Sequence, residues 1–160
     1  MKIAKTNAAR LLDRLAIPYT MHKGHVDEED LSATTLAKTL GADARRVFKT
    51  LVARGDKTGV LMACLPAESE LDLKALAQVS GNKHVEMVHL KEVFALTGYV
   101  RGGCSPLAAK KAYPVFLDAS AQDLETLFIS AGQRGVALEL APQDLAHAAQ
   151  ASFALLTRPA

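Results

Sequence analysis

Apolar residues recur every three or four positions in two N-terminal stretches, which is the spacing of one face of a helix. The first stretch, residues 7–15, follows a threonine N-cap and precedes a proline, so we predict a helix there that packs on a sheet. The second begins at Ser32 and stops at Gly41. Between them, residues 17–22 alternate apolar and polar side chains, which predicts a first short strand.

The middle of the chain contains the clearest hairpin. Residues 47–54 and 60–65 are rich in β-forming residues, and a five-residue loop with a glycine at each end joins them. A helix over residues 73–80, capped by an aspartate and closed by a glycine, follows it. A short strand over 85–88 and one more helix before Gly98 complete this half.

The C-terminal half predicts strands and helices that do not alternate one to one. The expected elements are strands over 113–118, 126–130, 136–140 and 152–157, a helical turn over 121–125, a tight turn over 131–135 and a helix from Pro142 to Gln150. This order argues against a doubly wound parallel sheet. We expect one α/β domain of the mixed α+β type over residues 1–160, with a mixed, largely antiparallel sheet or squat barrel and helices packed outside it.

Composition fits one domain with one substantial core. The chain has 160 residues, of which 49% are hydrophobic and 22% charged. It starts without the apolar run of a signal peptide and has no stretch near the roughly 20 apolar residues of a membrane span. We therefore expect a cytoplasmic protein with no membrane partner, and two widely spaced cysteines argue against a disulfide framework.

The charged residues are unevenly distributed along the chain, although the net charge is small. The net charge of +2 does not suggest nonspecific duplex binding, so no DNA partner is expected. Acid concentrates in residues 27–30, and base in residues 45–49 and 101–111. If the two basic stretches fold together, they form one positive face suited to a phosphate-bearing ligand.

The stretch Gly98–Pro106 is the main candidate for binding. A Gly-Gly pair followed by a Ser-Pro turn exposes successive backbone N–H groups, and nearby Arg101, Lys110 and Lys111 add positive charge. We predict that it meets an anion or polar ligand, and the alternative is a solvated turn between strands. The candidate binding residues are Gly98, Tyr99, Gly102, Gly103, Cys104, Ser105 and Pro106.

Two further signals lie elsewhere in the chain. Lys49 shares a strand face with apolar neighbours, so it either snorkels to an edge or meets a ligand or counter-charge. A second glycine turn contributes the candidates Ser130, Ala131, Gly132 and Arg134. Together with the first loop these residues predict a pocket with backbone donors around a cation. No Ser-His-Asp pattern or nucleophile elbow accompanies them.

Cysteine and metal chemistry are weaker possibilities. Cys64 is expected to pack as a small hydrophobe, whereas Cys104, near Arg101, could have thiolate character and a redox or nucleophilic role. His22, His25 and the acids at 27–29 carry donor types that zinc accepts. A solvated loop explains this weak spacing better, so we expect no metal and no cofactor.

Six segments of the chain resemble one known family. They are residues 47–52, 71–74, 83–87, 97–107, 110–111 and 130–135. In this order they resemble the YbaK/EbsC-type aminoacyl-tRNA deacylases, and especially the free-standing Cys-tRNA(Pro) deacylases, which are related to the editing domain of some prolyl-tRNA synthetases. The resemblance covers nearly the whole chain. Two positions depart from the family pattern, namely Gly24, where relatives tend to carry tyrosine, and Cys104, where isoleucine is common.

The resemblance implies removal of cysteine mistakenly attached to proline tRNA. It implies that Lys49 holds the aminoacylated 3′ end, that Gly102 and Gly103 place backbone donors near the ester, and that residues 130–135 cradle the terminal adenosine. The substrate's own thiol would attack the ester, and prolyl-tRNA synthetase is a possible partner that hands over the tRNA. Cys-tRNA(Cys) is a further substrate to be considered. The alternatives are a deacylase for another mischarged tRNA such as Ala-tRNA(Pro), a non-catalytic tRNA or nucleotide binding module, and a redox protein using Cys104.

Overall fold

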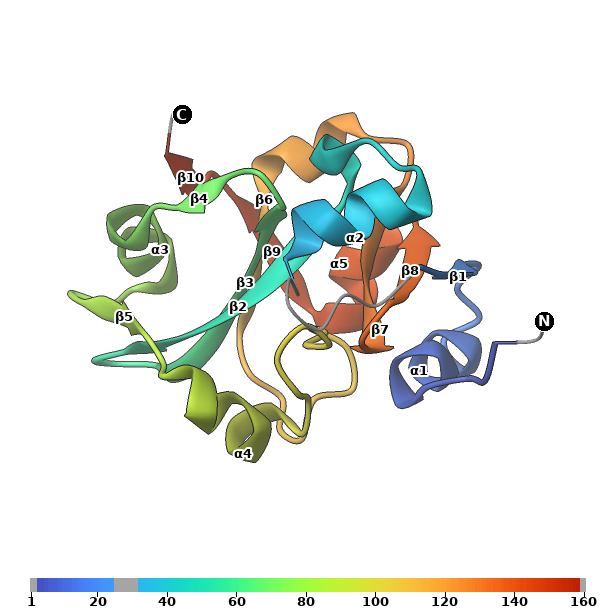
Figure 1. Ribbon diagram of the computed structural model, residues 1–160. Helices are drawn as coiled ribbons and strands as arrows, with labels where there is room; N and C mark the ends of the chain where they lie inside the picture. The colour runs from blue at the N-terminus through green and yellow to red at the C-terminus, as the bar shows by residue number, and fades with distance from the viewer. Residues whose placement is uncertain (1–2, 25–31, 159–160) are drawn as a thin grey trace.

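A long antiparallel hairpin, β2 (Phe48–Gly55) and β3 (Gly59–Pro66), forms the centre of the structure, a computed structural model that describes residues 3–24 and 32–158 (Figure 1). The other elements, in chain order, are α1 (Asn7–Arg14), β1 (Thr20–Lys23), α2 (Ala33–Leu40), η1 (Ala44–Arg46), β4 (Glu70–Leu71), α3 (Leu73–Ser80), β5 (Val85–Met87), η2 (Leu90–Glu92), α4 (Val93–Thr97), β6 (Val115–Asp118), η3 (Ala119–Asp123), β7 (Leu127–Gln133), β8 (Val136–Leu140), α5 (Pro142–Ala149), β9 (Ala151–Ala154) and β10 (Thr157–Arg158).

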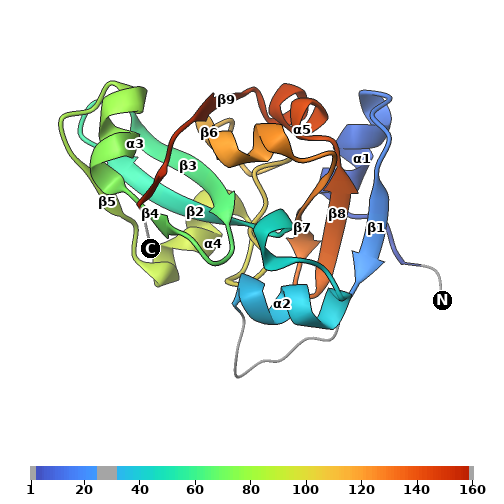
Figure 2. The ribbon, with the colours of Figure 1, turned by 90° about the horizontal axis from the view of Figure 1, so that it is seen from above.

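The strands of the described chain form three sheets, and the largest mixes antiparallel and parallel pairing. The largest has the order β5-β2-β3-β6-β9, in which β5, β2 and β3 are antiparallel and β6 and β9 add in parallel. A second sheet, β1-β8-β7, is antiparallel, and β4 pairs with β10. A bridge from Val47 to Phe128 joins the start of β2 to β7, so the two larger sheets meet there (Figure 2). The expected mixed, largely antiparallel α+β architecture is confirmed, with three sheets in place of a barrel.

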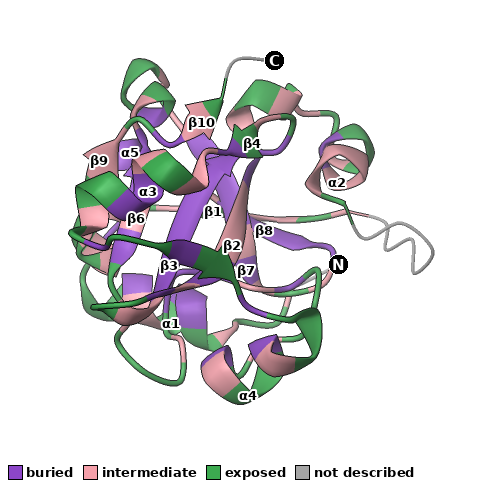
Figure 3. Cartoon of the chain, turned by 90° about the vertical axis from the view of Figure 1, so that its left-hand side faces the viewer, coloured by how far each residue is buried: buried purple, intermediate pink, exposed green. Residues whose placement is uncertain are grey.

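The core lies between the two larger sheets and the helices that cover them. Leu12 of α1 is fully buried in the same apolar cluster as Ile129 of β7 and Val52 of β2, which confirms that the first helix packs on a sheet. β3 is buried over most of its length and β2 at half of its positions, whereas α4 lies at the edge of the molecule (Figure 3). No helix in the described ranges has the length and apolar character needed to cross a bilayer.

Local signals locate the helices correctly. Ser32 and Asp72 cap α2 and α3 through side-chain oxygens that accept backbone N–H groups, as expected. Gly41 and Gly81 end these two helices in the left-handed conformation, and Pro142 occupies the first turn of α5. These devices act within a few residues, so the sequence alone reveals them.

Several expected boundaries differ from the structure, and the strand expected from residue 113 begins at Val115. The first strand begins at Thr20, because the Ile17 N–H donates to the Leu12 carbonyl (3.0 Å) and closes α1. The expected turn over 131–135 is shorter, since β7 runs through an irregularity after Ser130 and pairs again at Gln133. The final strand is split, because β9 pairs with β6 and β10 pairs with β4.

Candidate functional site

A cavity of about 360 Å³ lies beside the edge of β2. On the side of β2 away from β3, β5 pairs only with Ala53–Gly55. The edge from Lys49 to Leu51 therefore has no strand partner there within the described chain, and it borders the cavity. The other walls come from α2, β7, the segment from Met87 to Val93, and the glycine-rich loop after α4.

Lys49 lines this cavity, as the sequence suggested. Its ammonium donates to the Ala67 carbonyl at 3.2 Å, and no carboxylate of the described residues forms an ion pair with it. Partial burial lowers the pKa of Lys49, while the charge of Glu70 acts in the opposite direction. The result is a partly dehydrated cation at the wall of the cavity.

The two glycine segments contact each other, which the sequence also predicted. Arg134 donates from Nε to the Arg101 carbonyl at 2.7 Å. A Cβ atom on Gly103 would lie 3.2 Å from the Arg134 backbone nitrogen, so the two backbones pack closely. Gly132 adopts φ +96°, and a Cβ there would lie 2.7 Å from Tyr99 Cε1. These contacts hold the two segments together at one end of the cavity.

Only some of the candidate residues reach the cavity. Gly102, Cys104 and Ser130 line it together with Lys49. The Gly103 N–H donates to the Val100 carbonyl (3.0 Å), so this donor is used within the loop. The remaining candidates do not line the cavity but build the loops around it. Gly98 ends α4, Pro106 and Ala131 are buried, and Gly132 and Arg134 make the contacts above. The Tyr99 hydroxyl donates to the Leu107 carbonyl, and Ser105 Oγ accepts the Leu107 N–H (3.2 Å).

The alternative of a thiolate at Cys104 is disfavoured by the burial of this residue. Burial raises the pKa of this thiol to about 11, although a hydrogen bond with Thr97 acts the other way. Cys104 is therefore a protonated thiol at neutral pH and a weak nucleophile. Burial likewise raises the pKa of Cys64 to about 12, and Cys64 packs in the core as expected.

The two expected basic stretches meet only in part, since Lys49 and Arg101 line the same cavity while the two arginines of the first stretch are paired. Arg45 pairs with Asp43 at 2.7 Å, and Arg46 pairs with Glu139 at 3.0 Å. Arg101, Lys110 and Lys111 of the other stretch are exposed. Paired arginines attract phosphate less strongly, so the available positive charge lies on the glycine-loop side of the cavity.

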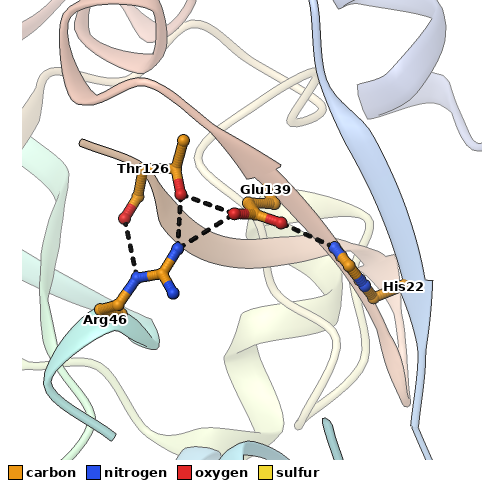
Figure 4. A network of polar contacts seen from close by, with 4 residues as sticks. All are labelled: His22, Arg46, Thr126 and Glu139. Atoms are coloured by element: carbon orange, nitrogen blue, oxygen red, sulfur yellow. Dashed lines mark hydrogen bonds and ion pairs between the residues drawn. The ribbon is translucent and has the colours of Figure 1, made fainter. Parts of the chain in front are cut away.

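A polar network lies behind one wall of the cavity. Glu139 accepts from Arg46, from the Thr126 hydroxyl (2.6 Å) and from His22 Nε2 (2.9 Å) (Figure 4). These bonds, that of Thr126 first, lower the pKa of the Glu139 carboxyl against the effect of partial burial. The Arg46 guanidinium lies 5.0 Å from the ring centroid of Phe128, a cavity-lining residue. The network therefore helps to hold Phe128 in the wall.

Sequence reasoning missed the apolar wall of the cavity. Leu36, Val93 and Ile129 line it together with Phe128. The periodic spacing of Leu36 and Val93 marks an inward helix face, but the same spacing serves a filled core and a cavity wall alike. α2 can approach because Gly24 has no side chain, since a Cβ there would lie 3.2 Å from Leu36 Cδ1 and closer still to the Thr39 hydroxyl.

The metal hypothesis falls mostly outside the described residues, since His25 and residues 27–29 lie there. His22 is described and contacts Glu139. Within residues 3–24 and 32–158, no group of three or more His, Cys, Asp or Glu could hold a metal ion.

Comparison with known proteins relates the chain to one family. The profile of the aminoacyl-tRNA editing domain matches residues 27–148. EbsC of Enterococcus faecalis, a candidate Cys-tRNA(Pro)/Cys-tRNA(Cys) deacylase, is 46% identical over 96% of this chain and 93% of its own. YwhH of Bacillus subtilis, an uncharacterised protein, is 32% identical over 75% of this chain and 78% of its own.

Solved structures share the fold at lower identity. A candidate trans-editing enzyme for prolyl tRNA synthetase matches with a TM-score of 0.82 and 21% identity over 98% of this chain and all of its own. The hypothetical protein APE2540 matches with a TM-score of 0.86 and 20% identity over 96% of this chain and all of its own.

Proposed function

The chain belongs to the aminoacyl-tRNA editing family, and on this premise we propose that it deacylates Cys-tRNA(Pro) in trans. The activity in the name of EbsC supports cysteine as the amino acid. The observation that carries the proposal is the cavity: Lys49 and the glycine loop both line it, and its described lining residues include no His, Asp or Glu. Such a lining can hold and polarise an ester, and the described residues in it include no carboxylate or imidazole that could act as general base for a protein nucleophile.

The substrate's own thiol then supplies the nucleophile. Its sulfur bonds to the ester carbonyl carbon, the bond from that carbon to the tRNA 3′ oxygen breaks, and the thiol proton ends on the departing oxygen. The product is a cyclic thioester of cysteine, which water later opens. Intramolecular attack has a large effective molarity, so the protein mainly has to orient the ester and stabilise its developing negative charge. Lys49 provides that charge stabilisation, or grips the adjoining phosphate, from a partly dehydrated position.

The accompanying partner is proposed to be prolyl-tRNA synthetase. The exposed cations near the cavity, Arg101, Lys110 and Lys111, form a small surface for a whole tRNA. A synthetase that releases mischarged tRNA would compensate for weak binding, and this role would place the protein in the cytoplasm. Adding the synthetase should lower the KM for Cys-tRNA(Pro), while tight binding of free proline tRNA by this protein alone would contradict the proposed dependence.

The test is the rate of ester loss from proline tRNA charged with cysteine, alanine or α-aminobutyrate. The last replaces the thiol by a methyl group of similar size. We expect rapid release of cysteine only, with a loss of about 100-fold or more in Lys49→Ala, the scale of removing one charge-stabilising donor. Lys57→Ala, on the exposed hairpin loop, is the matched control.

Three outcomes would contradict the proposal. Faster release of alanine than of cysteine would favour a deacylase for another mischarged tRNA. Equal release of cysteine and α-aminobutyrate would remove the thiol from the mechanism. Binding of tRNA with an unchanged ester half-life would favour a non-catalytic binding module.

A further inference from the structure

The mouth of the cavity is marked by its exposed lining residues. Leu90 is 62% exposed and Met87 is 42% exposed, and Arg101 and Gly102 on the facing loop are also exposed. Ser32, the N-cap of α2, also lines the cavity and is exposed, so it forms a third side of the mouth. A nucleotide chain that leaves the cavity between the first two sides passes an apolar side and a basic side.

The apolar side continues beyond the cavity. Phe94 lies four residues after Leu90 where η2 runs into α4, so the two side chains lie about one helical turn apart. Phe94 is 62% exposed, while its neighbour Val93 is buried and lines the cavity. Large exposed apolar side chains that adjoin a binding cavity mark an interaction surface. α4 lies at the edge of the molecule (Figure 3).

The charge around this ridge favours a polyanion. Lys91 is exposed on η2, and the Lys110 backbone N–H donates to the Thr97 carbonyl at 2.9 Å, which places Lys110 beside the end of α4. No ion-pair partner for Lys91, Lys110 or Arg101 lies among the described residues. The acid on the same segment, Glu92, is engaged by Arg54 at 3.7 Å and accepts the His89 N–H at 3.1 Å.

We propose that Leu90 and Phe94 form a stacking platform for the unpaired nucleotides that precede the terminal adenosine of the aminoacylated tRNA. Single-stranded nucleic acid binds where aromatic faces accept bases and nearby cations follow the phosphates, and this surface has both. The inference rests on the proposed function for its ligand. It assigns Phe94 the task of positioning the strand, with no part in breaking the ester.

The first experiment compares two substrates that differ only in the nucleotides beyond the ester. Phe94→Ala should raise the KM for Cys-tRNA(Pro) about 5- to 20-fold at unchanged kcat, because one base loses its stacking partner. The same variant should hydrolyse 3′-cysteinyl-adenosine, which has no preceding nucleotides, at the wild-type rate. Phe94→Tyr should retain the wild-type KM. Leu155→Ala removes a 69% exposed apolar side chain that does not line the cavity, and serves as the control.

The second experiment measures binding without any ester. A fluorescent RNA tetranucleotide of sequence ACCA should bind the wild-type protein, and Phe94→Ala should weaken this binding by a similar factor. This arm gives an answer even if no deacylation occurs, so failure of the platform and failure of the proposed function are distinguishable. Equal loss of activity on both substrates, or unchanged binding of ACCA, would overturn the proposal. Loss of self-association or of synthetase binding in Phe94→Ala, with ACCA binding intact, would overturn it in favour of a protein-docking surface.

Discussion

The two ends of β2 satisfy their polar groups in different ways. At the hairpin end, β2 lies between β3 and β5, and the buried Asn82 side chain closes the turn. Its carboxamide oxygen accepts the N–H groups of Lys57 (2.8 Å) and Thr58 (3.0 Å), and its nitrogen donates to the hydroxyls of Thr58 and Ser80. At the other end, the edge at Lys49 faces the cavity, and its ammonium contacts one carbonyl. One end satisfies its polar groups within the protein, and the other borders the cavity where we propose that the substrate binds.

The largest effect on stability is expected from a substitution at the hairpin end of β2. Asn82→Ala removes an acceptor from two backbone N–H groups and opens a small void, so we expect the free energy of unfolding to fall by about 2–3 kcal/mol. The rate of ester release by folded protein should not change, because Asn82 does not line the cavity. Urea unfolding and ester release measured on the same preparation test both halves. Asn82→Asp, which keeps an acceptor, should lose less, and a loss of activity at full folding would contradict the separation of the two ends.

A smaller loss of stability with a larger loss of activity is expected at the cavity end. Gly132→Ala forces a Cβ onto a residue at φ +96° and against Tyr99, which costs about 1–2 kcal/mol and shifts the glycine loop. A displacement near 1 Å at a reacting centre lowers rates about 100-fold, so kcat/KM should fall at least 10-fold.

Gly59→Ala is the matched control for this change. Gly59 also has a positive φ, +72°, but a Cβ there meets nothing within 4 Å, and it lies in the hairpin turn. This variant should lose about 1 kcal/mol of stability and no activity. If Gly59→Ala and Gly132→Ala lowered kcat/KM equally, backbone strain rather than the contact with Tyr99 would explain the effect.

The contrast between the ends also explains what could be predicted from the sequence. Helix caps such as Asp72 and glycine stops such as Gly81 act over a few residues, and both were predicted at the correct positions. The meeting of the two glycine segments was predicted because each carried its own turn signal. Asn82 as the closure of the hairpin, and Arg46 as the partner of Glu139, depend on contacts over 25 and 93 residues of sequence that no local pattern encodes.

The same limit applies to Cys104. A cysteine beside an arginine in a glycine loop has the sequence context of a reactive thiol, but reactivity depends on burial, which the fold determines. Burial keeps the Cys104 thiol protonated. The fold likewise determines which apolar side chains line the cavity. The sequence thus indicated which segments meet at the site, while the polarity of the site required the structure.

Substitution of Cys104 is expected to have the smallest effect on activity. With a pKa of about 11 against an ordinary value of 9.0, the thiol is protonated at neutral pH, so Cys104→Ala should change kcat/KM at pH 7 less than about 2-fold. Alkylation of Cys104 by iodoacetamide, followed by peptide mass spectrometry, should accelerate about tenfold per pH unit up to about pH 10 and level off near pH 11.

The raised pKa of Cys104 also determines the direction in which the free energy of unfolding changes with pH. Between pH 9.0 and about 11 the Cys104 thiol retains its proton in the folded protein but has lost it in the unfolded chain. The stabilising contribution of Cys104 to the free energy of unfolding is therefore full below pH 9.0 and is lost as the pH rises through about 11. Cys104→Ala should therefore lose stability less steeply over this range than the wild type, in urea titrations at fixed pH. Fast alkylation at pH 7, or loss of ester release in Cys104→Ala, would instead show that Cys104 is a reactive thiol that takes part in the reaction.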